Sequence, residues 1–434
     1  MRPQAVFAFR WFQFCLLRLP TTQFTLGEVM MELNVVYPCV AALDVHQAKL
    51  TVCVLYESAT GELVAEIKEF GGFKKDRELM SAWVASFRPQ IVVMESTGVY
   101  WKSPYAALEK HQLPLAVVNA RHVKQVPGRK TDIADAQWLA MLARNGLLRG
   151  GFVPPVQFRE LRLLARQMQK LTGILSSEKN RLHKALADAG IRLAVVVSDL
   201  QGKSAKAMVK GLLDGETPAQ VLRHADKRLQ ATEAELLDAL DGDLSASHRF
   251  VVGEILAHCE ELEARIERFR QQLLQGLSPY RALLQSLQTL PGVDETAAAL
   301  LLAEIGDDMK PFGTPAKLAS WAGVCPGNNE SAGKKKSGKM RKGNPYVRRI
   351  LCEAANAASR TRCGLQDKFK GLMIRRGRKR AIFAIAHKLL KIVFRLIERG
   401  DYYRDAQFDY EALSVQKNAS RWMKKLIQYG YITA

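Results

Sequence analysis

The chain has 434 residues, enough for two or three domains with real cores, and 48% of them are apolar, which excludes a largely disordered protein. Lys and Arg number 64 against 43 Asp and Glu, and the net charge of +21 predicts a polyanionic partner, with nucleic acid ahead of an acidic membrane surface. No run of about 18 apolar residues occurs, so we expect no membrane span. The seven cysteines form no CxxC pair, which argues against a zinc site.

Residues 1–35 are expected to be a disordered extension or the product of a misassigned start. The segment begins like a signal peptide, but Arg10 and Arg18 interrupt its apolar stretch and no clean small-residue cleavage site follows. Met31 opens a stretch that is typical of an ordinary protein start. The sequence leaves Met1 and Met31 open as the true first residue.

Residues 36–155 are typical of an α/β domain. A turn at 58–62 joins two of the strand-like runs as in a hairpin, and a helical pattern covers 75–86. Apolar and β-branched runs predict strands at 39–43, 51–56, 63–69, 91–94 and 114–119. Three consecutive strands followed by alternating helices and strands are the element order of the RNase H-like fold, which we therefore predict here.

The rest of the chain is expected to be mostly helical. Residues 156–285 carry apolar residues at three- and four-residue spacing with charged flanks, which predicts a long helical hairpin or coiled coil, partly broken around 198–216. Residues 286–400 form a third region, and 401–434 a C-terminal tail. Between Lys310 and Arg380 there are 19 Lys and Arg against three acids, so the positive charge is concentrated there, as in a binding surface.

Four acidic residues of the α/β domain stand at positions suited to a common pocket. Asp44 ends the first predicted strand and Glu95 ends the fourth, and these strands are neighbours in an RNase H-like sheet. Asp132 and Asp135 lie at the start of a predicted helix, where a spacing of three puts both on one face. Each carboxylate alone has a simpler structural explanation, as a turn or helix-start residue. Together they predict a site for two Mg²⁺ ions that act on a phosphodiester.

A Gly- and Lys-rich stretch in the third region contains two serines, Ser331 and Ser337. A serine among cations near a phosphate could form a covalent phosphoserine link, but from the residues alone the favoured explanation is a basic loop that only contacts phosphates. The segment TLPGVDETAAALLLAEIGD has the Pro-Gly turn of a helix-hairpin-helix element, or of an ordinary turn between helices.

The chain resembles the insertion-sequence transposases of family 110, subgroup 1111, which are related to the Piv-type DNA invertases. The matching segments are collinear and span roughly residues 38–395; they are AALDVHQ, VVMESTGVYW, VKQVPGRKTDIADAQWLAMLARNGLL, LPGVDETAAALLLAEIGD, LASWAGVCPGNNESAGKKKSGKMRKGNPYVRR and KRAIFAIAHKLL. The extension at the start and the tail at 401–434 fall outside the resemblance.

The resemblance implies a RuvC-like domain with a D-E-D-D tetrad, a coiled coil and a C-terminal transposase domain with a catalytic serine. By motif, the tetrad falls on Asp44, Glu95, Asp132 and Asp135, and would hold Mg²⁺ or Mn²⁺. The serine falls on Ser331, although relatives have a Ser-Gly pair where this chain has Ser-Ala-Gly, so Ser337 stays in reserve. A guide noncoding RNA and assembly as a homodimer or homotetramer are also implied.

The leading interpretation is therefore a bacterial, cytoplasmic and nucleoid-associated transposase that cuts and rejoins DNA through a phosphoserine link. The alternatives are a RuvC-like nuclease that uses metal-activated water, and an inactive DNA- or RNA-binding remnant. The residues expected to contact nucleic acid are basic; they are Arg129, Lys130, Lys334, Lys335, Lys336, Lys339, Arg341, Lys342, Arg348 and Arg349.

Overall fold

The computed structural model describes residues 35–96, 98–119, 134–200, 202–326, 329–331, 333–337, 340, 342–405 and 410–433. The chain divides into two compact units, Met1–Gly151 and Phe152–Ala434. The extension predicted at the start lies outside the described residues except for its last one. The finer domain boundaries at 155, 285 and 400 stay predictions.

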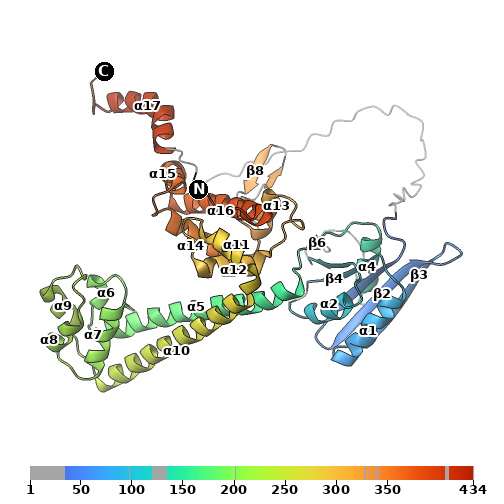
Figure 1. Cartoon of the computed structure of the whole chain (residues 1–434), viewed down its shortest axis with the longest axis horizontal. Helices are drawn as coiled ribbons and strands as arrows, with labels where there is room; N and C mark the ends of the chain where they lie inside the picture. The colour runs from blue at the N-terminus through green and yellow to red at the C-terminus, as the bar shows by residue number, and fades with distance from the viewer. Residues whose placement is uncertain are drawn as a thin grey trace, which may run out of the picture. The chain divides into compact units, whose positions relative to one another are not determined.

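The first unit is built on one mixed sheet. Its strands are β1 (Val40–Val45), β2 (Lys49–Glu57), β3 (Leu63–Gly71), β4 (Ile91–Glu95), β5 (Leu115–Val118) and β6 (Gly150–Gly151) (Figure 1). They are ordered β3-β2-β1-β4-β5-β6. The β1–β2, β2–β3 and β5–β6 pairs are antiparallel, and the β1–β4 and β4–β5 pairs are parallel. This order and these directions are those of the RNase H-like fold, so the predicted strands and their arrangement are confirmed.

Helices cover the sheet because its central strands are apolar on both sides. α4 (Ala134–Arg144) packs on β1, β2 and β4, and its buried residues share a cluster with Val40 and Ala42. The intervening residues of β1, among them Leu43, are equally buried, so the other face is covered as well. There α1 (Lys74–Ser86) and α2 (Lys102–Glu109) pack against each other, α1 also contacts β3, and α2 contacts β5.

The second unit contains two long helices, α5 (Val156–Asp188) and α10 (Ala246–Gly276), which lie side by side (Figure 1). Leu171 and Leu175 of α5 pack with Cys259 and Leu262 of α10. Near the end of α5, Leu182 and Leu186 are buried in one cluster with Val252 and Leu256 from the start of α10. The two helices therefore run antiparallel. The predicted helical hairpin is thus present, and a coiled coil in the strict sense stays a prediction.

Between these helices the sequence predicted a partial break at 198–216, and the structure has a small helical bundle over a wider range. Its elements are α6 (Leu193–Val196), α7 (Lys203–Leu213), α8 (Pro218–Val221), the 3-10 turn η1 (Leu222–His224) and α9 (Glu233–Leu240). Met208 and Leu212 of α7 are buried with Leu236 and Leu240 of α9. The long helices are thus interrupted at 198–216 as expected, but the interruption is wider, and within it α7 is itself an amphipathic helix despite the glycines and charged residues around it.

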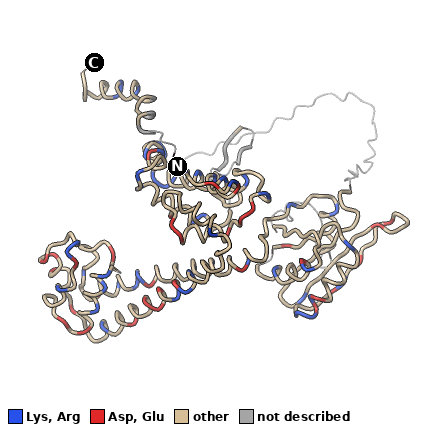
Figure 2. The backbone as a smooth tube through the Cα atoms, in the orientation of Figure 1, with Lys and Arg blue, Asp and Glu red and all other residues tan. Residues whose placement is uncertain are grey.

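The remaining helices of this unit form its larger core. They are α11 (Arg281–Gln288), α12 (Glu295–Ile305), α13 (Pro315–Ala322), α14 (Pro345–Ala358), α15 (Gly364–Arg376), α16 (Arg378–Arg399) and α17 (Tyr410–Gln428), with the 3-10 turn η2 (Ser278–Tyr280) before α11. Figure 2 shows Lys and Arg along α14, α15 and α16, where the sequence has its excess of positive charge. No helix among the described residues is long and apolar enough to cross a membrane.

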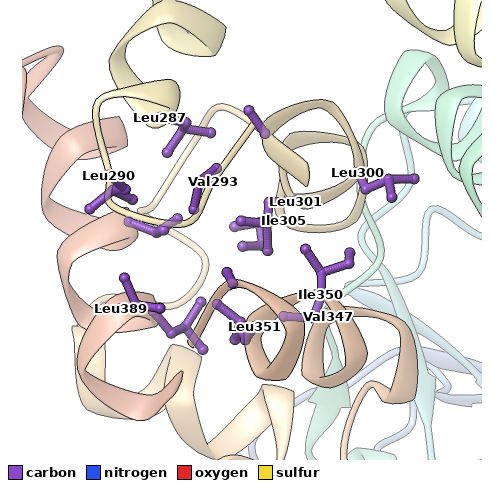
Figure 3. Close-up of a cluster of buried hydrophobic side chains, with 14 of the residues drawn as sticks. Leu287, Leu290, Val293, Leu300, Leu301, Ile305, Val347, Ile350, Leu351 and Leu389 are labelled. Atoms are coloured by element: carbon purple, nitrogen blue, oxygen red, sulfur yellow. The ribbon is translucent and has the colours of Figure 1, made fainter. Parts of the chain in front are cut away.

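This core also takes in the open end of the helical hairpin, where α5 begins and α10 ends. Phe158 and Leu161 at the start of α5 and Leu273 near the end of α10 are buried in the same cluster as α12, α14 and α16. In Figure 3, Leu290 and Val293, from the turn between α11 and α12, lie in one cluster with Leu351 and Leu389. Leu284 and Leu287, on either side of residue 285, belong to this same cluster. The helix-hairpin-helix interpretation of the α11–α12 turn stays a prediction.

Candidate active site

Asp44 and Glu95 end up side by side because of the register between two parallel strands. The register pairs Leu43 of β1 with Met94 of β4, and Asp44 and Glu95 are the next residue of each strand. Parallel neighbours are about 4.8 Å apart, and residues in register point to the same face. The two half-buried carboxylates thus share one face at the carboxyl edge of the sheet. The predicted adjacency of the two strands is confirmed.

That face is the one covered by α4, since Asp44 alternates in phase with Val40 and Ala42. The carboxyl end of α4 lies beside the beginning of β1: the Arg144 carbonyl accepts from the amide of Val36 at 2.9 Å, and Arg144 Nη1 donates to Pro38 O at 3.2 Å. The 11-residue helix is about 15 Å long, close to the length of the strand. Its first turn, which contains Asp135, therefore lies toward the carboxyl end of β1.

The three described acids offer carboxylate oxygens, the donors that Mg²⁺ and Mn²⁺ prefer. Among the described residues no group of three or more Asp, Glu, His or Cys side chains is close enough to hold a metal ion. Mg²⁺ commonly binds through only one or two carboxylates and completes its shell with water and substrate phosphates. The pair of strand-end carboxylates fits such a site. Asp132, Arg129 and Lys130 lie outside the described residues.

Two neighbouring loops add contacts that the sequence analysis did not anticipate. His46 Nε2 lies 3.1 Å from Asp44 Oδ2. The Tyr100 hydroxyl, from the segment after β4, donates to Gln47 Oε1 at 3.3 Å and so joins that segment to the turn between β1 and β2. The segment ALDVHQ could have indicated that His46 and Gln47 belong to the site, because residues that directly follow a strand-end carboxylate lie at the same edge of the sheet.

The candidate serines lie on a two-stranded hairpin in the second unit. β7 (Asn329–Ser331) and β8 (Lys334–Ser337) pair antiparallel, with Ser331 opposite Lys334 and Asn329 opposite Ser337. A further bridge joins Pro326 to Met340. The sequence predicted a basic loop here, because the stretch has no apolar alternation from which strands could be recognised.

The basic residues of the second unit that are predicted to contact nucleic acid differ in their surroundings. The backbone of Lys334, Lys335 and Lys336 forms β8, whereas Lys339 and Arg341 lie outside the described residues. Lys342 is exposed and Arg348 is half-buried. Arg349 is already engaged within the protein: Nε donates to Glu353 at 3.0 Å and Nη1 donates to the Gln169 carbonyl at 3.5 Å.

Sequence reasoning missed a buried carboxylate, Glu304 of α12, which is fully shielded from solvent. Arg166 of α5 binds it through two hydrogen bonds of 2.7 and 2.9 Å, and Asn344 Nδ2 donates to it at 2.7 Å. Arg162 lies 3.5 Å away and also donates to the Glu304 carbonyl oxygen. Burial lowers the pKa of Arg162 to about 10, although Glu304 opposes this. Arg166, Arg162 and Asn344 are 138, 142 and 40 residues from Glu304, so no local sequence pattern indicates these pairs.

Two family models match the chain. One, described as a transposase, represents the DEDD domain of IS110 elements and matches residues 41–191. The other, described as the transposase IS116/IS110/IS902 family, matches residues 284–370. Together they cover the carboxylates of the first unit and the serine hairpin of the second.

Two curated relatives are transposases by description. The chain is 26% identical over 333 residues to the transposase for insertion sequence element IS1111A of Coxiella burnetii, covering 74% of this chain and 81% of the relative. It is 29% identical over 153 residues to the putative transposase y4pF/y4sB of Sinorhizobium fredii, covering 34% and 39%.

Two solved structures of RuvC from Thermus thermophilus also match. The first is 16% identical with a TM-score of 0.21, and the second, in complex with a Holliday junction substrate, is 14% identical with a TM-score of 0.20. Each match covers 26% of this chain and 99% of the other. The TM-scores are too low to support the fold, which rests on the strand order and directions.

Proposed function

The chain belongs to the IS110 family of transposases, and from this membership we propose that it cuts and rejoins DNA through a metal-binding carboxylate site and a serine nucleophile. Transposases in general cleave and transfer DNA strands. The observation that carries the finer proposal is the register of β1 and β4, which brings Asp44 and Glu95 to one edge and one face of the sheet.

The proposed metal ligands are Asp44, Glu95 and Asp135, together with Asp132. Like-charged carboxylates in one pocket repel each other, and this cost is relieved only when cations neutralise them. Bound Mg²⁺ or Mn²⁺ would supply stabilisation of the charge that builds up on a phosphate oxygen. The start of α4 adds the positive end of a helix dipole to the same region, which favours negative charge there.

The proposed nucleophile is Ser331, with Ser337 as the reserve. Ser331 Oγ forms a bond to phosphorus while the bond from phosphorus to a deoxyribose oxygen breaks; the hydroxyl proton is lost to water and the departing oxygen takes up a proton. The phosphodiester energy is retained in the phosphoserine link, so a second DNA hydroxyl can displace the serine and rejoin the strand without a cofactor such as ATP.

The proposed nucleic-acid surface uses the basic residues in and after the hairpin, together with Arg129 and Lys130, which precede α4 in the sequence. Of these, Lys342 is exposed and Arg348 is half-buried, whereas Arg349 must release Glu353 or share it. We propose further that the polyanion includes a guide noncoding RNA as well as DNA, and that the protein acts as a homodimer or homotetramer. The concentrated positive charge supports the RNA partner. The family resemblance supports both the RNA partner and the assembly as a homodimer or homotetramer.

The test is a strand-cleavage assay on element-end DNA with its flanking RNA and Mg²⁺, in which covalent protein–DNA complex is trapped in denaturant. Ser331→Ala should abolish the complex, whereas Ser337→Ala, the matched control on the same hairpin, should leave it. Asp44→Asn and Glu95→Gln should lower its rate of formation on the order of 1,000-fold. Glu62→Gln, in the turn between β2 and β3, removes a carboxylate from the same unit and should have no effect.

The alternatives give different results in this assay. Cleavage without a covalent complex, unaffected by Ser331→Ala, would replace the proposal with a nuclease that activates water. Complex lost in Ser337→Ala but kept in Ser331→Ala would transfer the nucleophile to Ser337. No cleavage by the wild-type protein, with DNA binding intact, would identify a binding remnant.

A further inference from the structure

The buried carboxylate of Glu304 lies at the base of the hairpin that carries Ser331. Burying an ionised carboxylate costs several kcal/mol unless it is paired and fully hydrogen-bonded. Glu304 meets this requirement with the bidentate Arg166 and with Asn344 Nδ2, at distances of 2.7 to 2.9 Å. These contacts join α12 to the first half of α5 and to the start of α14.

Asn344 uses both ends of its side-chain amide. Its Oδ1 accepts from the amides of Tyr346 at 3.0 Å and Val347 at 3.3 Å, and so caps α14. Its Nδ2 faces Glu304, and its backbone amide donates to Trp321 O at 3.2 Å. The amide therefore has only one orientation that satisfies all its partners, which fixes the point where the chain leaves the hairpin and enters α14.

The two chain segments that enter and leave the hairpin also lie very close together at Gly343, the residue before Asn344 in the chain. A Cβ added to Gly343 would lie far inside van der Waals contact of the backbone of Ala322 and Gly323, so only glycine permits this approach. Further along, Pro326 and Met340 form a bridge between the two segments. The hairpin thus leaves the core from a narrow base, one side of which ends at Asn344.

Arginines and aromatic rings enclose the network. The Arg166 guanidinium lies 4.7 Å from the centre of the Tyr346 ring, and Arg162 lies 5.4 and 5.9 Å from the rings of Phe152 and Trp321. Apolar residues of similar volume would often stabilise such a core as well or better. Polar partners add something that apolar packing lacks, namely a fixed direction for each hydrogen bond.

We propose that Glu304 and Asn344 are positioning residues: the hydrogen bond between them, held by Arg166, fixes the base of the β7–β8 hairpin and with it the nucleophilic serine. This inference rests on the proposed function for the role of Ser331, and on the contacts above for the anchoring. Neither residue touches DNA; each acts through the hairpin.

The test exchanges the donor and the acceptor of the hydrogen bond between Asn344 and Glu304. Asn344→Asp keeps a good N-cap for α14 but sets a second carboxylate against Glu304. Glu304→Gln removes the charge that binds Arg166. The double variant Glu304→Gln/Asn344→Asp restores a donor–acceptor pair, with the amide now on α12 and the carboxylate at the cap, and keeps the net charge of the network. Glu254→Gln, an exposed carboxylate on α10, is the matched control.

Three quantities are measured on the full-length protein, well below each variant's unfolding temperature. The first is the rate of covalent complex formation at saturating DNA, the second is the Kd for that DNA, and the third is amide hydrogen exchange in 329–337. We expect each single variant to lower the rate on the order of 100-fold with Kd unchanged, and to speed exchange in the hairpin. The double variant should recover most of both losses, which a general loss of stability would not produce.

Wild-type rates in both single variants, or unchanged hairpin exchange, would overturn the proposal, as would a double variant no better than the worse single one. If the wild-type protein forms no covalent complex, the proposed function fails instead. The rate of amide hydrogen exchange in residues 329–337 then still shows whether the hydrogen bond between Glu304 and Asn344 anchors the hairpin.

Discussion

His387 on α16 shows how the surroundings of one side chain set its protonation. Burial is the main cause that lowers its pKa from the usual 6.5, and the positive charges of Lys391 and Lys368 lower it further. Lys368 on α15 is affected in the same way, since burial and the neighbouring Lys388 and Lys391 lower its pKa. The interface between α15 and α16 therefore disfavours any additional positive charge.

A pH-dependent loss of stability follows from this. The unfolded chain takes up a proton at His387 as the pH falls below about 6.5, whereas the folded chain resists it, so the free energy of unfolding decreases as the pH falls through this range. Urea midpoints measured at pH 7.5 and 5.5 should differ less in His387→Gln than in the wild-type protein. Lys391→Gln should also reduce the difference. An equal pH dependence in all three proteins would show that His387 titrates alike in both states.

At the scale of elements, the turn between α11 and α12 is fixed by its packing on α14. Gly292 has φ +81°, and a Cβ there would lie 2.8 Å from the Ala358 amide nitrogen and even closer to the Ala354 carbonyl oxygen. The neighbouring Leu290 and Val293 are buried in the cluster of Figure 3. The backbone of this turn thus contacts another helix of its own core.

We expect Gly292→Ala to lower the free energy of unfolding of the second unit by about 2–3 kcal/mol, because the new Cβ meets rigid backbone and the positive φ is strained. The control is Gly253→Ala in α10, where a Cβ meets nothing within 4 Å. That change should stabilise the helix by about 0.5–1 kcal/mol. Chemical denaturation of both variants checks this. A harmless Gly292→Ala would mean that the turn can move away from α14.

At the scale of the molecule, each unit has a core of its own. In the first unit the sheet is buried on both faces, and the cluster beneath α4 consists entirely of residues from that unit. In the second unit, one core takes in α11 to α16 and the open end of the helical hairpin, where α5 begins and α10 ends. Another core lies in the small bundle that connects α5 to α10. The concentrated positive charge belongs to the second unit and the strand-end carboxylates to the first.

A fragment of residues 35–151 should therefore fold by itself. We expect cooperative unfolding in urea with a slope of about 1–2 kcal/mol per molar, as for a small domain. A fragment that ends at residue 118 lacks α4, leaves Val40, Ala42 and Val93 uncovered, and should not unfold cooperatively. Circular dichroism across a urea series compares the two fragments. Equal behaviour would mean that α4 is not needed to complete the core.

Local sequence patterns alone predicted five of the six described strands of the first unit, all but the short β6, and also the long helices of the second unit and the family. β-Branched runs bounded by turn residues and apolar residues at helical spacing are local patterns, and a strand-end carboxylate can be located from the strand alone. Asp44 and Glu95 were found in this way. The concentration of Lys and Arg between residues 310 and 380 is equally a property of the sequence.

The tertiary structure decided what depends on contacts between distant residues. Only the pairing of β1 with β4 brings Asp44 and Glu95 into register, and only the direction of α4 places its first turn, which contains Asp135, toward the carboxyl end of β1. In the sequence, Glu304 is a single acidic residue at the end of an apolar helix. Its partners Arg166 and Asn344 are 138 and 40 residues away. Local periodicity carries no information about such pairs, because burial in a shared core brings them together.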